Sequence, residues 1–283
     1  MKNSTIFLGR GSLLGDIATY LPVLTLVEKF FPNSSKTFFI NKKCAQILPL
    51  LANYPLIDRI YIGQFDEGIG LNDIDFIKKH NHYLEVNPQH RRWDWYNDEQ
   101  ASPNMVMENF NMVGMNWKLL NDNELVPKLV KWFDIDKKET KSIALWGWAG
   151  YFRDKNRSPT LEFWNKLVNA LYHNDYKIYQ FGHPNEPKID FAMRCNELAF
   201  FDQIKHSLGC SLSLNTDSGS GLILGCYEGY RQITLLTNWM QNHNCNFNVL
   251  TSKNPNNISL FAKDGCDNIP QEKVLDYVKL LLS

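Results

Sequence analysis

GRGSLLGDIATYLPVLTLVEKFFP, residues 9–32, is the stretch that decides the fold. Just before it, residues 5–8 have the apolar character of a short buried strand, and a Gly/Ser turn follows. The next apolar residues recur at helical spacing: Leu14, Ile17, Leu21, Leu24 and Val27. A strand, a glycine turn and a helix together predict a corner of an open α/β sheet. Ligands in such sheets bind outside the carboxyl ends of the strands, so this corner is a candidate binding site.

Asp16 lies where that helix begins. One interpretation is structural, because Asp is favoured at the cap and in the first turn of a helix, where it complements the free amides. The other is catalytic, because the same amides hold a carboxylate in a fixed place beside a bound ligand. Spacing alone does not separate the two interpretations.

Composition sets the scale of the protein and its class of partner. The chain has 283 residues, 44% of them hydrophobic, which is enough for two α/β domains of about 140 residues each. Thirty basic residues balance thirty acidic ones, so no overall field attracts nucleic acid or an anionic membrane. Six cysteines without a C-x-x-C pair indicate a reducing cytosol, and no apolar run of membrane-spanning length occurs. We expect a cytoplasmic protein with at most peripheral contact at the inner face of the membrane.

The first half continues as alternating strands and helices. Strands are expected at 36–40, 59–62 and 82–86, with a short helix at 44–51, and this order predicts a parallel sheet. The polar residues 87–104 then read as a long loop, of a kind that is usually functional or mobile, and 105–115 reads as a helix.

The second half restarts the same pattern. Strands are expected at 142–146, 177–181, 211–214 and 232–236, and helices at 161–172, 200–208, 221–225 and 273–282. We therefore expect two Rossmann-like domains, residues 1–138 and 139–283, with the last helix a candidate to pack back on the first domain.

Three short motifs in this order carry a resemblance to a known family. They are Ser12-x-x-Gly15-Asp16, then Gly182-x-Pro184-x-Glu186, and finally Asp217-Ser218-Gly219 at a second glycine corner. Together they resemble the ADP-heptose:lipopolysaccharide heptosyltransferases, glycosyltransferase family 9. The resemblance implies the GT-B fold, in which two Rossmann-like domains face each other across a cleft. It also implies inverting, metal-independent transfer of a heptose-like sugar from a nucleotide-diphosphate sugar to a hydroxyl of a surface glycan or lipopolysaccharide.

The resemblance also implies roles for single residues. Asp16 is the expected catalytic base, Glu186 is expected at the donor ribose and Asp217 at the donor sugar. The expected diphosphate-binding residues are Arg157, Lys155, Ser218 and Gly219, and the expected acceptor-binding residues are Ser12, Gly15, His90, Arg91 and Arg92. Two positions depart from the family pattern: Ser158 replaces a usual Trp, and Leu222 stands where the family usually has a His. Each of these assignments has a structural alternative: the loop that carries Lys155 and Arg157 can be a solvated surface, and Glu186 can be a carboxylate in the first turn of a helix.

The expected partners are a nucleotide-sugar donor, with ADP-heptose as the suggested one, and a glycan or glycolipid acceptor; no nucleic acid, metal or cofactor is expected. Two Asp-x-Asp triplets, 73–75 and 134–136, keep open a metal-dependent transferase, because this spacing can hold a divalent cation under a diphosphate. A catalytically degenerate GT-B domain that binds nucleotide or glycan without transfer is a second alternative. No Gly-x-Ser-x-Gly elbow or Gly-x-x-x-x-Gly-Lys phosphate loop occurs, which argues against the hydrolases and nucleotidases that carry them.

Overall fold

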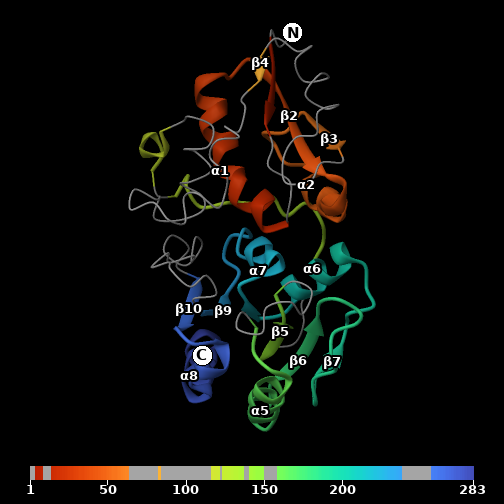
Figure 1. The fold of residues 1–283 in the computed structure, drawn as a ribbon, viewed down its shortest axis with the longest axis vertical. Coiled ribbons are helices and arrows are strands. Elements are labelled where there is room, and N and C mark those ends of the chain that lie inside the picture. The colour runs from red at the N-terminus through yellow and green to blue at the C-terminus, as the bar shows by residue number, and fades with distance from the viewer. Residues whose placement is uncertain are drawn as a thin grey trace. The chain divides into compact units, whose positions relative to one another are not determined.

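The computed structural model describes residues 4–8, 14–63, 82–83, 116–121, 123–136, 140–149, 158–237 and 256–283 (Figure 1). These described residues divide into two compact units, one reaching Val130 and the other beginning at Lys131. Each unit is built around a sheet of its own. None of the described helices is long and apolar enough to cross a membrane.

In the part of the first unit that the structure describes, the sheet has four parallel strands in the order β3-β2-β1-β4. Their bounds are β1 (Ser4–Leu8), β2 (Ser34–Asn41), β3 (Arg59–Gly63) and β4 (His82–Tyr83). The chain therefore adds β2 and β3 on one side of β1 and then crosses to its other side for β4. This confirms the expected parallel sheet, in which β1 and β2 are the inner strands.

Helix α1 (Leu14–Phe30) follows β1 directly. Its residues Ile17, Leu21 and Leu24 are at most 1% exposed, and its opposite face is buried as well. A helix that is apolar on all sides needs cover on all sides, which accounts for the burial of α1 in the first unit. The expected helix at 44–51 is instead a 3₁₀ segment, η1 (Lys42–Ile47), followed by the single turn α2 (Leu48–Leu51). The Asn41 side chain accepts a hydrogen bond from the Lys43 amide and so caps η1, which explains the earlier start.

The second unit has six parallel strands in the order β10-β9-β8-β5-β6-β7. The bounds are β5 (Ser142–Trp146), β6 (Lys177–Phe181), β7 (Met193–Arg194), β8 (Leu212–Thr216), β9 (Gln232–Thr237) and β10 (Asn257–Ala262). Taken along the chain, this is the strand order 3-2-1-4-5-6 of the Rossmann fold. The two edge strands, β7 and β10, were not among the strands expected from the sequence.

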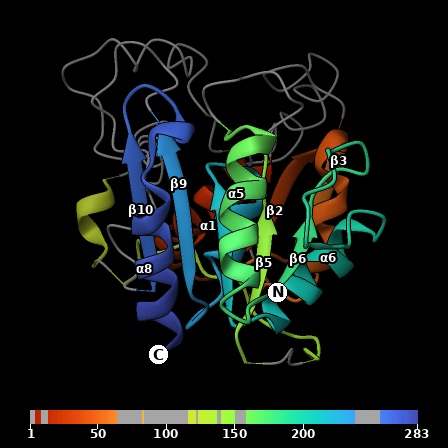
Figure 2. The same cartoon turned by 90° about the horizontal axis from the view of Figure 1, so that it is seen from below.

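Four helices cover this sheet: α5 (Leu161–Tyr172), α6 (Phe200–Gly209), α7 (Gly219–Leu224) and α8 (Gln271–Leu282). Helices α5 and α8 lie side by side on one face (Figure 2), where they bury Trp164, Leu167, Val274 and Val278 against the strands. Each fully buried side chain of this kind contributes roughly 1.5–3 kcal/mol, so this face is the main core of the unit. Helix α8 packs against α5, β8 and β9 of its own unit.

Candidate functional site

The first candidate position is the corner between β1 and α1. Strand β1 has β2 on one side and β4 on the other, so the strand order reverses beside it. Ligands of open α/β sheets bind at such a reversal, outside the carboxyl ends of the strands. Gly15 and Asp16 lie in the first turn of α1, directly after this point, and Gly15 is buried. Ser12 lies outside the described residues, as does the side chain of Asp16.

The second unit has its reversal between β5 and β8, which are neighbours in the sheet although β6 and β7 lie between them in sequence. The loop after β5 and the loop after β8 therefore start side by side. These are the loops that carry the expected diphosphate-binding residues. Two of the three sequence motifs, the one that ends at Asp16 and the one at residues 217–219, thus follow strands at which the strand order reverses, one in each unit.

The loop after β5 is fixed at both of its described ends. The Ala149 amide donates to the Ser158 hydroxyl oxygen at 2.8 Å, and the Trp164 indole N–H donates to the Gly147 carbonyl at 2.9 Å. Lys155 and Arg157 lie outside the described residues. Ser158 is thereby held to Ala149, three residues beyond the end of β5.

The loop after β8 leads into the short helix α7. Ser218 is its cap residue: the hydroxyl oxygen accepts from the Gly221 amide at 3.3 Å. Because first-turn amides have no partner within a helix, the N–H groups of Gly219 and Ser220 are the donors that this corner offers to a bound anion. A Cβ at Gly221 would lie 3.2 Å from the Thr216 carbonyl oxygen and 3.2 Å from the Asn215 Cβ, so glycine allows α7 to pack closely on β8. Asp217 is partly buried beside the cap.

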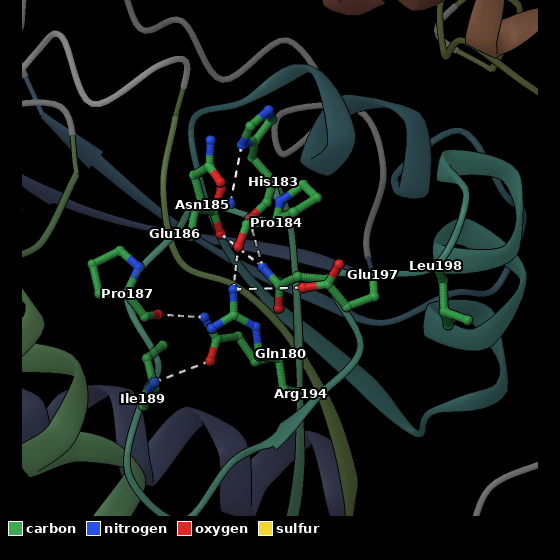
Figure 3. A network of polar contacts seen from close by, with 12 residues as sticks. Gln180, His183, Pro184, Asn185, Glu186, Pro187, Ile189, Arg194, Glu197 and Leu198 are labelled. Carbon is green, nitrogen blue, oxygen red and sulfur yellow. Dashed lines mark hydrogen bonds and ion pairs between the residues drawn. The ribbon is translucent and has the colours of Figure 1, made fainter.

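The third position is the loop after β6, which carries Glu186 (Figure 3). Glu186 is 7% exposed, and its Oε2 accepts a hydrogen bond from the Asn196 side-chain amide at 3.3 Å. The same amide donates to the His183 carbonyl at 3.0 Å. Gly182 begins the loop with a φ of 136°, and a Cβ there would lie 2.1 Å from Oε2, so the carboxylate occupies the space that a side chain at 182 would need.

Burial in this loop raises the pKa of Glu186 from 4.5 to about 7. Hydrogen bonds from the His183 backbone and from Asn196, and the positive charge of Arg194, favour the ionised form but do not offset the loss of water. Arg194 also donates to the Pro184 carbonyl, as Figure 3 shows. A carboxylate held in this way accepts hydrogen bonds from a neutral ligand, such as a vicinal diol, once it is ionised.

Two buried glutamines that the sequence did not point to hold this loop. Gln180, in β6, donates to the Pro187 carbonyl at 2.7 Å and accepts from the Ile189 amide at 3.0 Å (Figure 3). Gln203, in α6, bonds to Gly182 by both its oxygen and its nitrogen. A glutamine on an amphipathic helix is ordinarily interpreted as a surface residue, and nothing in a single sequence indicates a partner 21 positions away.

The remaining expected residues are not placed. His90, Arg91 and Arg92 lie outside the described residues, and so does the Asp-x-Asp triplet at 73–75. Asp134 and Asp136, of the other triplet, are both exposed. Within the described ranges there is no group of three or more His, Cys, Asp or Glu that could hold a metal ion.

Two parallel-sheet units in one chain, the second with the Rossmann strand order, correspond to the GT-B class of fold. Comparison with solved structures bears this out. The chain is similar to E. coli ADP-heptose LPS heptosyltransferase II, with a TM-score of 0.71 at 12% identity, over 99% of this chain and 98% of that one. It is equally similar to a glycosyl transferase family 9 protein from Veillonella parvula, with a TM-score of 0.71 at 14% identity, over 100% and 98% of the two chains.

A third similar structure is the E. coli heptosyltransferase WaaC with ADP-2-deoxy-2-fluoro heptose, with a TM-score of 0.66 at 11% identity over 98% of this chain and 99% of that one. No family model matches the sequence, and no curated protein matches it. At these identities the likeness is one of fold. The expected α/β GT-B fold is confirmed.

Proposed function

We propose that this protein is a glycosyltransferase that moves a heptose-like sugar from a nucleotide-diphosphate sugar to a hydroxyl of a surface glycan or lipopolysaccharide. One observation carries the proposal: in each unit, a loop with a predicted site motif leaves the sheet where the strand order reverses. The fold similarity to heptosyltransferases, one of them solved with an ADP-sugar analogue, supports the choice of donor class.

In the proposed reaction, Asp16 acts as the general base. It takes the proton of the acceptor hydroxyl while that oxygen forms a bond to the anomeric carbon. The bond between the anomeric carbon and the diphosphate oxygen breaks at the same time, and its electron pair leaves with the nucleoside diphosphate. Attack from the face opposite the nucleotide inverts the anomeric centre. His90, Arg91 and Arg92, with Ser12 and Gly15, are the proposed acceptor contacts.

The leaving diphosphate develops negative charge, which has to be stabilised as the bond breaks. Arg157 and Lys155 are the proposed cationic partners, and they need no metal ion to fulfil this role. The amide of Gly219 and the hydroxyl proton of Ser218 are the proposed neutral donors. The Ser218 oxygen already accepts from the Gly221 amide, and its proton stays available for a phosphate oxygen.

Glu186 is the proposed partner of the donor ribose, as acidic residues beyond the second strand are in dinucleotide sites. Its Oε2 is held by Asn196, which fixes the orientation of the carboxylate before a ligand arrives. Asp217 is the proposed contact to the hydroxyls of the transferred sugar.

The direct test is a thermal-shift screen of the purified protein with ADP-, UDP-, GDP- and CMP-sugars and the matching free nucleotides. Because a ligand that binds only the folded protein stabilises it by mass action, the true donor raises the melting temperature in a concentration-dependent way. We expect ADP-heptose and ADP to do so. A screen in which no nucleotide sugar or nucleoside diphosphate shifts the melting temperature would refute the proposal. Activity that EDTA abolishes would refute its metal independence.

A nucleotide- or glycan-binding protein without transferase activity is the second candidate. The observation that favours it is Leu222, an apolar residue in α7 at the position where the family usually has a His. Transfer to an acceptor, or hydrolysis of the donor, by purified protein separates the two. Binding without either reaction would favour the second candidate.

A further inference from the structure

Gln203 is a buried polar residue whose side chain bonds to the backbone at two points between β6 and α6, one before β7 and one after it. It is 5% exposed and lies in α6. Its Oε1 accepts from the Gly182 amide at 2.8 Å, and its Nε2 is within reach of three carbonyl oxygens, those of Gly182 at 3.1 Å, Leu198 at 2.9 Å and Asn196 at 3.3 Å. One side chain thus joins the start of the loop that carries Glu186 to the segment between β7 and α6.

The bonds to Gly182 have a direct consequence for Glu186. Gln203 pairs with both the N–H and the C=O of Gly182, as the backbone of a neighbouring strand would, and so fixes this residue at its φ of 136°. The Glu186 carboxylate lies against the bare α-carbon of Gly182. A rotation of Gly182 would therefore displace the carboxylate or leave it without its supporting contact.

The bond to Asn196 acts on the same carboxylate from the other side. The Asn196 side chain donates to Glu186 Oε2, while its own backbone carbonyl accepts from Gln203. Asn196 is fully buried, so it has no water with which to replace a lost partner. Both neighbours that define the position of the Glu186 carboxylate, Gly182 and Asn196, are thus fixed by Gln203.

We infer that Gln203 is the positioning residue of the donor nucleoside site: it holds the carboxylate of Glu186 in the orientation that receives the ribose hydroxyls, without touching the donor itself. This inference rests on the proposed function. Helix α6 carries none of the three sequence motifs, and this inference gives it a role in donor affinity.

The test compares two substitutions on the same helix. Gln203→Met keeps the length and approximate volume of the side chain and removes all of its hydrogen bonds. Ser207→Ala, one turn later, removes a different buried hydrogen bond, in which the Ser207 hydroxyl oxygen accepts from the Trp146 indole of β5 at 3.0 Å. Free energies of unfolding are measured for both, so that loss of stability and loss of function are compared directly.

For Gln203→Met we expect the donor KM, and the Kd of the free nucleoside diphosphate measured by calorimetry, to rise about tenfold, with kcat within about twofold of wild type. For Ser207→Ala we expect both constants to stay within about twofold at a similar loss of stability. In a Glu186→Ala background, Gln203→Met should add no further rise, because the residue it acts through is gone.

A rise of the donor KM that is equal in both variants, or one that persists in the Glu186→Ala background, would overturn this inference and leave the proposed function standing. Failure of unaltered protein to bind any nucleoside diphosphate would overturn the proposed function, and this inference with it. Should Gln203→Met not fold, Gln203→Glu takes its place under the same criteria, because it keeps the acceptor for the Gly182 amide and loses both donors.

Discussion

Replacing Glu186 by Gln should stabilise the second unit at alkaline pH, and the size of the effect follows from its burial. The carboxyl has a pKa of about 7 in the folded protein, because burial disfavours its charge, against an ordinary value of 4.5. Each pH unit between these values corresponds to 1.36 kcal/mol, so the ionised carboxylate costs the folded state about 3 kcal/mol.

The sign follows from which state holds the proton. Below pH 4.5 the carboxyl is protonated in both states, and its contribution does not change with pH. Between pH 4.5 and 7 the unfolded chain releases the proton while the folded protein keeps it, so the free energy of unfolding falls as pH rises. Above pH 7 both states are ionised and the cost is constant.

The measurement is urea unfolding of wild type and Glu186→Gln at a series of pH values from 4.5 to 8, followed by tryptophan fluorescence. Trp146 and Trp164 are buried in the second unit and report on it. Glutamine does not titrate, and its amide oxygen can still accept from Asn196. We expect the difference in unfolding free energy to grow from near zero at pH 4.5 to about 3 kcal/mol in favour of the variant at pH 8.

A difference that stays flat with pH, or a variant that is the less stable protein at pH 8, would refute this reasoning. The same variant should bind the nucleoside diphosphate about tenfold more weakly at pH 8, because a ribose hydroxyl loses a charged acceptor. A residue that lowers the stability of the folded protein but strengthens ligand binding is typical of a functional site.

Two further substitutions test the loops themselves. Gly182→Ala should lower the free energy of unfolding by more than about 3 kcal/mol, because the residue has a φ of 136° and the new methyl group would collide with the Glu186 carboxylate. Gly229→Ala should lower it by about 1 kcal/mol, because Gly229 has a φ of 75° but open space around it. Similar melting temperatures for these two variants would contradict this. Ser218→Ala removes the acceptor of the Gly221 amide and the hydroxyl proposed to donate a hydrogen bond to the diphosphate. It should cost about 1 kcal/mol in chemical unfolding and weaken nucleoside diphosphate binding; unchanged affinity would exclude its hydroxyl from the site.

The strands at the centre of the second sheet, β5 and β8, could be predicted from the sequence because they are buried on both faces. Strand β5 is the clearest case, with every residue buried. The edge strands of the second sheet could not be predicted. Strand β7 is two exposed residues, and β10 leaves Phe261 60% exposed, so neither shows the pattern of a buried strand.

The candidate site divides in a similar way. The motifs around Asp16 and Asp217 could be found because glycine turns between strands and helices are local features. The setting of Glu186 could not be foreseen, since Asn196, which contacts its carboxylate, lies 10 positions further on and is itself bonded to Gln203. Side-chain contacts across 10 or more positions leave no periodic signal in a single sequence.

The most direct test of the account is the turnover of Asp16→Asn with ADP-heptose and a lipopolysaccharide-core acceptor, measured as release of nucleoside diphosphate. Its matched control is Glu272→Gln, which alters an exposed first-turn carboxylate of α8. We expect wild type and Glu272→Gln to release ADP only when acceptor is present, and Asp16→Asn to lose turnover by at least about a hundredfold while its affinity for ADP stays within about twofold. Turnover of Asp16→Asn close to that of wild type would contradict it.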